Sequence, residues 1–138
     1  MSFFPSAPSV VPSAAHVLIA RPSRDLLVAE RFWTEGLGLD VLCRVAPTSE
    51  GEQALLMVGR PRATWHLELV EDQQVGPRPT EEDLLVLSLD GPVPDALVRQ
   101  LCEAGGRPVG SRNPYWGVTI EDPDGYRLVL CRRGWTSQ

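Results

Sequence analysis

The sequence holds a small set of side chains that could carry chemistry: His16, His66, Glu68 and Arg127. His66 and Glu68 are two residues apart in a β-prone segment, so a strand would place both on one face of its sheet. An imidazole or a carboxylate can orient or deprotonate a bound molecule, and a guanidinium can hold an anionic one. Whether these groups act together depends on the elements that position them.

Apolar periodicity and turn residues divide the chain into two halves with the same order of elements: one strand, one helix and then three strands. Pro22 is expected to end the first strand. The first helix is expected to begin at Asp25 and to end at Gly36, and the second helix is expected to stop at Gly105. Strands are expected at 16–20, 39–45, 54–58, 65–70, 84–89, 107–109, 116–120 and 126–131.

Composition narrows the classes of protein and of partner. The 138 residues suffice for one ordinary domain, and 13 basic against 18 acidic residues give a net charge of −5. No basic patch stands out for nucleic acid, and no apolar run approaches the roughly 20 residues that a membrane helix needs. Three widely spaced cysteines without a C-x-x-C motif predict reduced thiols and a cytoplasmic protein.

Four segments, taken in order, resemble the motifs of a known superfamily. They are His16-Val-Leu-Ile, FWTEGLGL at 32–39, HLEL at 66–69 and GVTIEDPDGYRL at 117–128. The chain resembles the vicinal oxygen chelate superfamily, which includes glyoxalase I, fosfomycin- and bleomycin-resistance proteins and extradiol dioxygenases, and it looks nearest to small uncharacterised bacterial members. The resemblance implies an α+β fold of two βαβββ modules that form paired half-barrels around a cavity.

The expected organisation follows from this resemblance and from the linker composition. Residues 1–14 are Pro- and Ser-rich and predict a flexible arm, and residues 134–138 form a tail. A glyoxalase-like domain spans 15–133, with module one at about 15–71, a linker at 72–83 and module two at about 84–133. A homodimer is expected from the resemblance alone.

Enzymes of this superfamily usually hold a divalent metal with four His, Glu or Gln ligands, two from each module. The resemblance places His16 and Glu68 at two of these positions, but Leu84 and Val129 at the others. Two protein ligands rarely hold a metal tightly, although His66 could help on the face of Glu68. No cofactor is therefore expected, and a divalent metal remains possible.

The resemblance also brings Glu68 and Arg127 onto converging strands. Arg127 would then either hold an anionic ligand or form a salt bridge with Glu68 that closes the cavity. Tyr115 and Trp116 fall near the cavity mouth, where they would stack on a flat ligand or plug the end of the barrel. Asp122 and Asp124 belong to a D-P-D-G turn, and we assign them no catalysis.

The leading hypothesis is a metal-independent module that binds a small aromatic or anionic molecule, similar in role to bleomycin-resistance proteins. Its predicted ligand contacts are His66, Glu68, Tyr115, Trp116 and Arg127. The alternative is a divalent-metal-dependent lyase or dioxygenase of glyoxalase type that uses His16 and Glu68. A metal-free enzyme with Glu68 or His66 as its base is a third possibility, and no catalytic residue is assigned.

Overall fold

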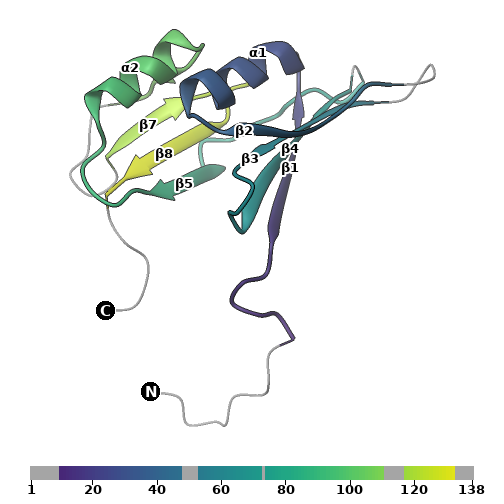
Figure 1. Cartoon of the computed structure of the whole chain (residues 1–138). Helices are drawn as coiled ribbons and strands as arrows, with labels where there is room; N and C mark the ends of the chain where they lie inside the picture. Colours follow the sequence, from purple (N-terminus) through teal and green to yellow (C-terminus); the bar gives the residue numbers. More distant parts are fainter. Residues whose placement is uncertain (1–9, 48–52, 73, 111–116, 133–138) are drawn as a thin grey trace.

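The computed structural model describes residues 10–47, 53–72, 74–110 and 117–132. Two four-stranded sheets, each accompanied by a helix, make up the α+β fold of two βαβββ modules that the sequence predicted (Figure 1). Module one contains β1 (Val17–Ser23), α1 (Leu26–Arg31), η1 (Phe32–Gly36), β2 (Asp40–Val45), β3 (Ala54–Gly59) and β4 (Trp65–Glu71). Module two contains β5 (Leu84–Ser88), α2 (Asp95–Glu103), β6 (Arg107–Pro108), β7 (Val118–Glu121) and β8 (Arg127–Cys131).

The two sheets have the same topology. Their strand orders are β1-β4-β3-β2 and β5-β8-β7-β6, so the first strand of each module lies at a sheet edge beside the last. β1 runs parallel to β4 and β5 runs parallel to β8, whereas the other pairs are antiparallel. The parallel registers place Leu18 opposite His66 and Leu84 opposite Arg127.

The first strand is longer than the sequence predicted. Proline was expected to stop it, but β1 continues through Pro22 to Ser23, paired with β4 throughout. Because β1 lies at a sheet edge, only alternate backbone N–H groups are needed for the ladder, and a residue whose nitrogen faces away can be proline. The expectation that Pro22 ends the strand was therefore wrong.

The first helix lies where the sequence places it, but its second half differs in type. Asp25 caps it, and its carboxylate oxygen Oδ1 accepts from the backbone N–H of Leu27 at 3.0 Å and of Val28 at 3.3 Å. The α-helical turns then give way to the π-helical segment η1, in which the N–H of Leu37 donates to the carbonyl of Phe32 at 3.0 Å. Apolar spacing does not distinguish the two helix types.

One hydrophobic core serves both modules. The helices α1 and α2 lie side by side over the two sheets (Figure 1), and the fully buried side chains come from every layer. These side chains include Phe32, Trp33, Leu67, Leu101, Ile120, Leu128 and Leu130. Between the helices, Gln100 Nε2 donates to the carbonyls of Glu35 at 2.9 Å and of Gly36 at 3.0 Å. No helix in the described part of the chain is long and apolar enough to cross a bilayer.

Candidate functional site

The histidines predicted from the sequence meet on the side of the first sheet that faces away from the helices. Along β4, Leu67 and Leu69 are buried in the core, so His66 and Glu68 alternate onto the opposite face. His16 comes directly before β1, close to His66 because the two strands are parallel neighbours. His16 Nε2 lies 2.5 Å from Nδ1 of His66, and the ring centroids are 4.7 Å apart.

This pairing determines what His66 offers to a ligand. In a hydrogen bond between two neutral imidazoles, one nitrogen donates and the other accepts, which fixes the tautomer of both rings. His66 Nε2 is buried, and no hydrogen-bond partner for it lies among the described residues. That atom is therefore an uncommitted donor or acceptor, depending on the direction of the His16–His66 bond.

A glycine on the neighbouring strand makes room for His66. Gly59 of β3 pairs with His66, and a Cβ at Gly59 would lie only 2.9 Å from the Cβ of His66 and 3.1 Å from Leu42 Cδ1. Neither contact is compatible with an unshifted structure. The glycine at residue 59 therefore leaves the space that the side chain of His66 needs.

Glu68 lies on the same face as His66 but does not contact His16. Its strand neighbours are Ala20 and Met57, and within the described chain it makes no hydrogen bond or ion pair of its own. The half-buried carboxylate of Glu68 therefore has no committed partner among the described residues and is available to a polar group of a ligand.

The side chains present do not fit the four-ligand metal site that the superfamily resemblance implies. His16 is close to His66 rather than to Glu68. In the second sheet, Leu84 lies opposite Arg127 and Val86 opposite Val129, so the two remaining positions carry no ligand atoms. Among the described residues, no group of three or more His, Cys, Asp or Glu side chains could hold a metal ion.

Arg127 is engaged by one carboxylate of module two and one of the linker. Its Nε lies 3.9 Å from Glu121 Oε2, and its Nη2 lies 3.9 Å from Glu81 Oε1. Glu121 is its cross-strand partner in the β7–β8 ladder, which explains the pairing. The salt bridge between Glu68 and Arg127 that the sequence left open is not formed by these described side chains.

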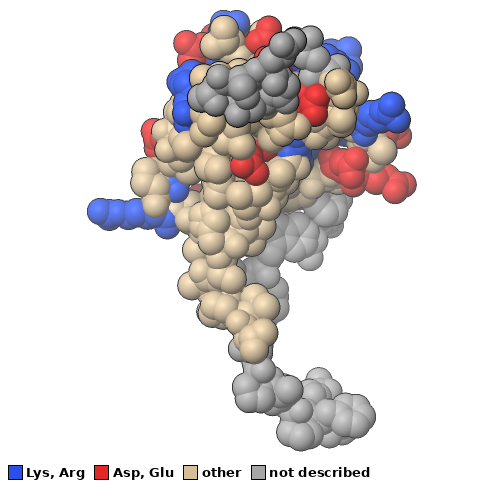
Figure 2. All heavy atoms as spheres, turned by 90° about the vertical axis from the view of Figure 1, so that its right-hand side faces the viewer, with Lys and Arg blue, Asp and Glu red and all other residues tan. Residues whose placement is uncertain are grey.

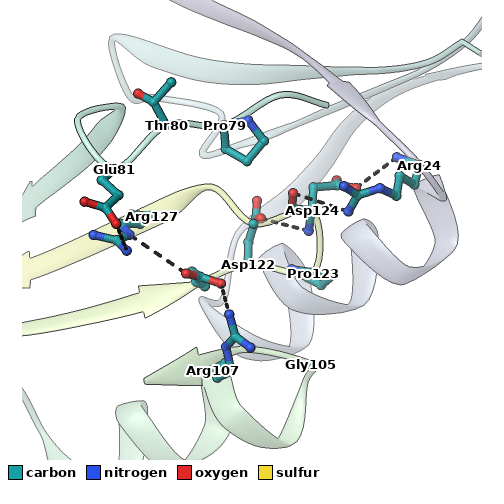
Figure 3. A pocket seen from close by; sticks show the side chains of 12 residues that line it. Arg24, Pro79, Thr80, Glu81, Gly105, Arg107, Asp122, Pro123, Asp124 and Arg127 are labelled. Atoms are coloured by element: carbon teal, nitrogen blue, oxygen red, sulfur yellow. Dashed lines mark hydrogen bonds and ion pairs between the residues drawn. The ribbon is translucent and has the colours of Figure 1, made fainter. Parts of the chain in front are cut away.

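Arg127, Glu121 and Glu81 line a polar cavity of about 620 Å³ (Figure 3). It is lined by Arg24, Arg107, Arg127 and the D-P-D-G hairpin. Each guanidinium in it already has an oxygen partner: Arg24 Nη1 donates to the carbonyl of Asp124 at 3.4 Å, and Arg107 Nη2 lies 2.5 Å from Glu121 Oε1. The cavity is therefore electrostatically balanced and less suited to an anion than its arginines suggest.

The D-P-D-G segment forms the turn that the sequence predicted. Asp122 Oδ1 accepts from the backbone N–H of Asp124 at 2.9 Å and of Tyr126 at 2.8 Å. Gly125 takes a φ of 95°, which favours glycine. Burial raises the pKa of Asp122 to about 6, although the two N–H donors act in the opposite direction.

Family models match both halves of the chain. The model of the YycE-like N-terminal domain matches residues 17–70, and that of the YycE-like C-terminal domain matches residues 82–132. The chain is also 40% identical, over 125 residues, to the uncharacterised protein YycE of Bacillus subtilis (strain 168), an alignment that covers 85% of this chain and 87% of YycE. The chain belongs to the YycE-like family.

Solved structures place this YycE-like chain in the vicinal oxygen chelate superfamily. The crystal structure of Bacillus subtilis YycE superposes with a TM-score of 0.71 at 36% identity, covering 90% of this chain and 93% of that one. A glyoxalase/bleomycin resistance protein from Streptomyces sp. CB03234 gives 0.59 at 27% identity, covering 85% and 99%. TnmS3, an antibiotic-binding protein from Streptomyces sp. CB03234, gives 0.61 at 26% identity, covering 87% and 97%. The chain is thus a glyoxalase/bleomycin-resistance-like protein.

Sequence reasoning missed two contacts between the YycE-like modules. Arg24 at the end of β1 bonds to Asp124 of the hairpin, and the Arg21 guanidinium lies over the ring of Tyr126. Arg21 lies two residues after Ile19 and therefore points to the same, core-facing side of β1. A charged residue at such a position could have drawn attention to Arg21, but the strand was expected to end before it. Tyr115 and Trp116 lie outside the described residues, so their predicted role at the cavity mouth stays a prediction.

Proposed function

We propose that this chain is a metal-independent binding module for a small aromatic or anionic molecule, held on the face of the β1–β4 sheet that carries His66 and Glu68. The observation that carries the proposal is the buried Nε2 of His66, which lacks a partner among the described residues. A buried polar atom without a partner is costly, and a ligand that hydrogen-bonds to it recovers that cost.

The surroundings of this atom support the proposal. Leu18 and Met57 pair with His66 and Glu68 in the ladders, so two polar side chains lie within a largely apolar face. Small-molecule sites in proteins have this composition, with few polar groups that orient a ligand among apolar neighbours. The similarity to TnmS3, an antibiotic-binding protein, favours a binding role over a structural one.

The donor set supports independence from a metal. Leu84 and Val129 occupy two of the four ligand positions, and His16 is engaged by His66 instead of converging with Glu68. Tyr115, Trp116 and Arg127 remain proposed contacts of the ligand. Arg127 would have to exchange its 3.9 Å contacts with Glu81 and Glu121 for the ligand.

We further propose that the site is completed in a homodimer in the cytoplasm. Apolar side chains at the start of the described chain are exposed, including Val10 at 96%, Val17 at 52% and Leu18 at 46%. In Figure 2 the described surface in the lower half of the view carries few charged side chains, whereas the charged side chains gather in the upper half. An apolar surface of this kind favours association with a second copy. The three cysteines are free, in keeping with a reducing compartment.

The binding test uses 8-anilinonaphthalene-1-sulfonate, an aromatic anion, and protein dialysed against EDTA. We expect saturable fluorescence with about one site per chain, and at least tenfold weaker binding in His66→Ala. Arg99→Ala, on the exposed side of α2, is the matched control and should bind like the wild type. Equal binding by His66→Ala and wild type would contradict the proposal.

Metal dependence is tested separately, on protein purified without a histidine tag. Elemental analysis and titration with Mn, Fe, Ni, Co and Zn should reveal no ion bound more tightly than roughly 10 μM. Two protein ligands rarely supply more affinity than that. Near-stoichiometric metal that is lost in both His16→Ala and Glu68→Ala would overturn the proposal and favour a metal-dependent enzyme. Light scattering tests the dimer, and a monomer at micromolar concentration would contradict it.

A further inference from the structure

Arg21 combines a cation–π contact with a buried guanidinium nitrogen that has no partner among the described residues. It lies on β1 opposite Leu69, so its side chain shares the face of Ile19 and leaves the sheet toward module two. Its Cζ atom lies 4.6 Å from the centroid of the Tyr126 ring. Its Nη1 is buried, and no hydrogen-bond partner for it exists among the described residues.

The contact with Tyr126 leaves the donors of this guanidinium unused. A cation–π interaction engages the flat face of the group, whereas its five N–H bonds point outward in the plane. Five other arginines of the described chain have a carboxylate within 4.0 Å, namely Arg31, Arg44, Arg60, Arg107 and Arg127. Arg21 has no such carboxylate among the residues that the structure describes, so its unpartnered Nη1 can donate to an oxyanion.

A cavity of about 610 Å³ adjoins Arg21, between the edge strand β1 and the chain segment that leads into β5. Its walls combine Arg21 and Arg78 with apolar side chains, among them Ile19, Val75, Leu84 and Tyr126. A second cavity of about 300 Å³, lined mainly by apolar groups, shares Arg21 and Val75 with the first. The volume accommodates a small organic molecule with an apolar body.

The acidic groups around the cavity limit the charge that a ligand can carry. Glu82 and Asp83 lie on its rim, and Asp83 Oδ2 is already held by the N–H and hydroxyl of Thr80 at 3.1 and 3.0 Å. In the hairpin, burial raises the pKa of Asp122 and of Tyr126, whereas the charge of Arg21 acts to lower both. The charges of Asp122 and Asp124 raise the pKa of Tyr126 further. The Oδ1 atoms of both carboxylates already accept from backbone N–H groups. Glu82 and Asp83 already balance the formal charges of Arg21 and Arg78, so repulsion grows with each further negative charge and limits the ligand to a single carboxylate.

We propose that the cavity beside Arg21 binds the carboxylate group of a small, otherwise apolar molecule. The planar guanidinium matches a carboxylate through two parallel N–H···O bonds, which gives the unpartnered Nη1 its acceptor. The apolar walls take the body of the ligand, and Tyr126 holds the guanidinium plane from below. The cavity reaches the His66 face at Ala20, the strand neighbour of Glu68. The proposal rests on Arg21, however, and does not depend on the function proposed for that face.

The test compares benzoate with benzamide, which has the same shape without the charge. Both are titrated into the full chain by two-dimensional amide NMR at constant ionic strength, with inorganic phosphate as a third probe. We expect benzoate to bind in the millimolar range, with shifts around Arg21 and Tyr126. Benzamide should bind at least tenfold more weakly. Equal binding of benzoate and benzamide, or tighter binding of phosphate, would overturn the proposal.

Variants locate the site. Arg21→Gln should weaken at least tenfold the benzoate binding that is seen in the shifts around Tyr126, whereas Arg99→Gln, at an exposed position, should leave it unchanged. If Arg21→Gln does not fold, Arg78→Gln replaces it, with an expected loss of threefold or more. Benzoate binding that is lost in His66→Ala and kept in the arginine variants would refute this site while supporting the one on the β4 face.

Discussion

The carboxylate oxygen Oδ1 of Asp124 accepts a hydrogen bond from the backbone N–H of Arg24 at 2.9 Å, although the two residues are 100 positions apart in the sequence. The side chain of Arg24 returns a bond to the carbonyl of Asp124 at 3.4 Å. The end of the first strand in module one is thereby fixed to the last hairpin of module two. Asp124 is 5% exposed, so water competes little for this contact.

Asp124→Ala should therefore destabilise the fold by about 1–3 kcal/mol, because it leaves a part-buried backbone N–H without its acceptor. Asp124→Asn keeps an acceptor oxygen and should cost less than half as much. Urea unfolding, followed by tryptophan fluorescence, measures both free energies. Asp90→Ala, at an exposed position, is the control. Equal losses for Ala and Asn would show that the hydrogen bond does not hold the modules.

Asp122 makes stability depend on pH. Burial raises its pKa in the folded chain to about 6 from the model-peptide value of 3.8. Between roughly pH 4 and pH 6 the folded state then binds more protons than the unfolded state, so the contribution of Asp122 to stability falls as pH rises through this window. Above roughly pH 7 the loss is nearly complete and amounts to on the order of 3 kcal/mol.

Asp122→Asn tests this contribution, because the amide keeps the oxygen that accepts from Asp124 and Tyr126 but has no charge to bury. The free energy of unfolding of Asp122→Asn, relative to the wild type, should rise by on the order of 3 kcal/mol from pH 4 to pH 7. Urea titrations at each pH measure the difference. A difference that stays constant with pH would contradict the raised pKa.

Gly59→Ala should disturb the His66 imidazole. The new Cβ would lie 2.9 Å from His66 Cβ, so the two strands must move apart or the ring must shift. We expect a loss of about 1–3 kcal/mol and a changed His66 ring resonance in NMR spectra. Gly76→Ala, where a Cβ meets nothing within 4 Å, is the matched control. Unchanged His66 resonances would mean that the glycine does not position the ring.

Gln100 joins the two helices through a single amide. Its Nε2 donates to two carbonyls at the end of η1, those of Glu35 and Gly36. Gln100→Ala should cost about 1–2 kcal/mol, because both carbonyls lose their partner at a close helix contact. Gln100→Glu replaces the donor with an acceptor and should be worse than Ala at neutral pH. Thermal unfolding ranks the variants, with Arg99→Ala as the neutral reference, and the reverse order would refute the role of the amide.

The order of the elements could be predicted because each half follows a simple pattern. Asp25 marks a helix start through its capping side chain, and Gly125 marks a tight turn through its left-handed backbone. Alternation placed His66 and Glu68 on one face, where the structure has them. Each of these features depends on residues that are close together in the sequence, so the local sequence pattern suffices to predict it.

The contacts that differ from expectation depend on neighbours distant in sequence. The sequence left open whether Arg127 pairs with Glu68 or holds a ligand, and the β7–β8 register instead supplies Glu121 as its neighbour. Pro22 is tolerated because β1 is an edge strand, which only the sheet order reveals. Arg21 and Tyr126 meet because two modules pack together, and neither residue type alone predicts that contact.

The shared core has a practical consequence. Phe32 lies so close to Gly106 that a Cβ there would approach its ring to 2.7 Å, so each half completes the packing of the other. If the chain were cut within the linker at 72–83, each half would expose the apolar face of its helix. We expect the two halves, once mixed, to reassemble into the folded protein. The two halves could therefore serve as a split reporter. Each half would be fused to one of two proteins, and the signal would return when those proteins bind each other.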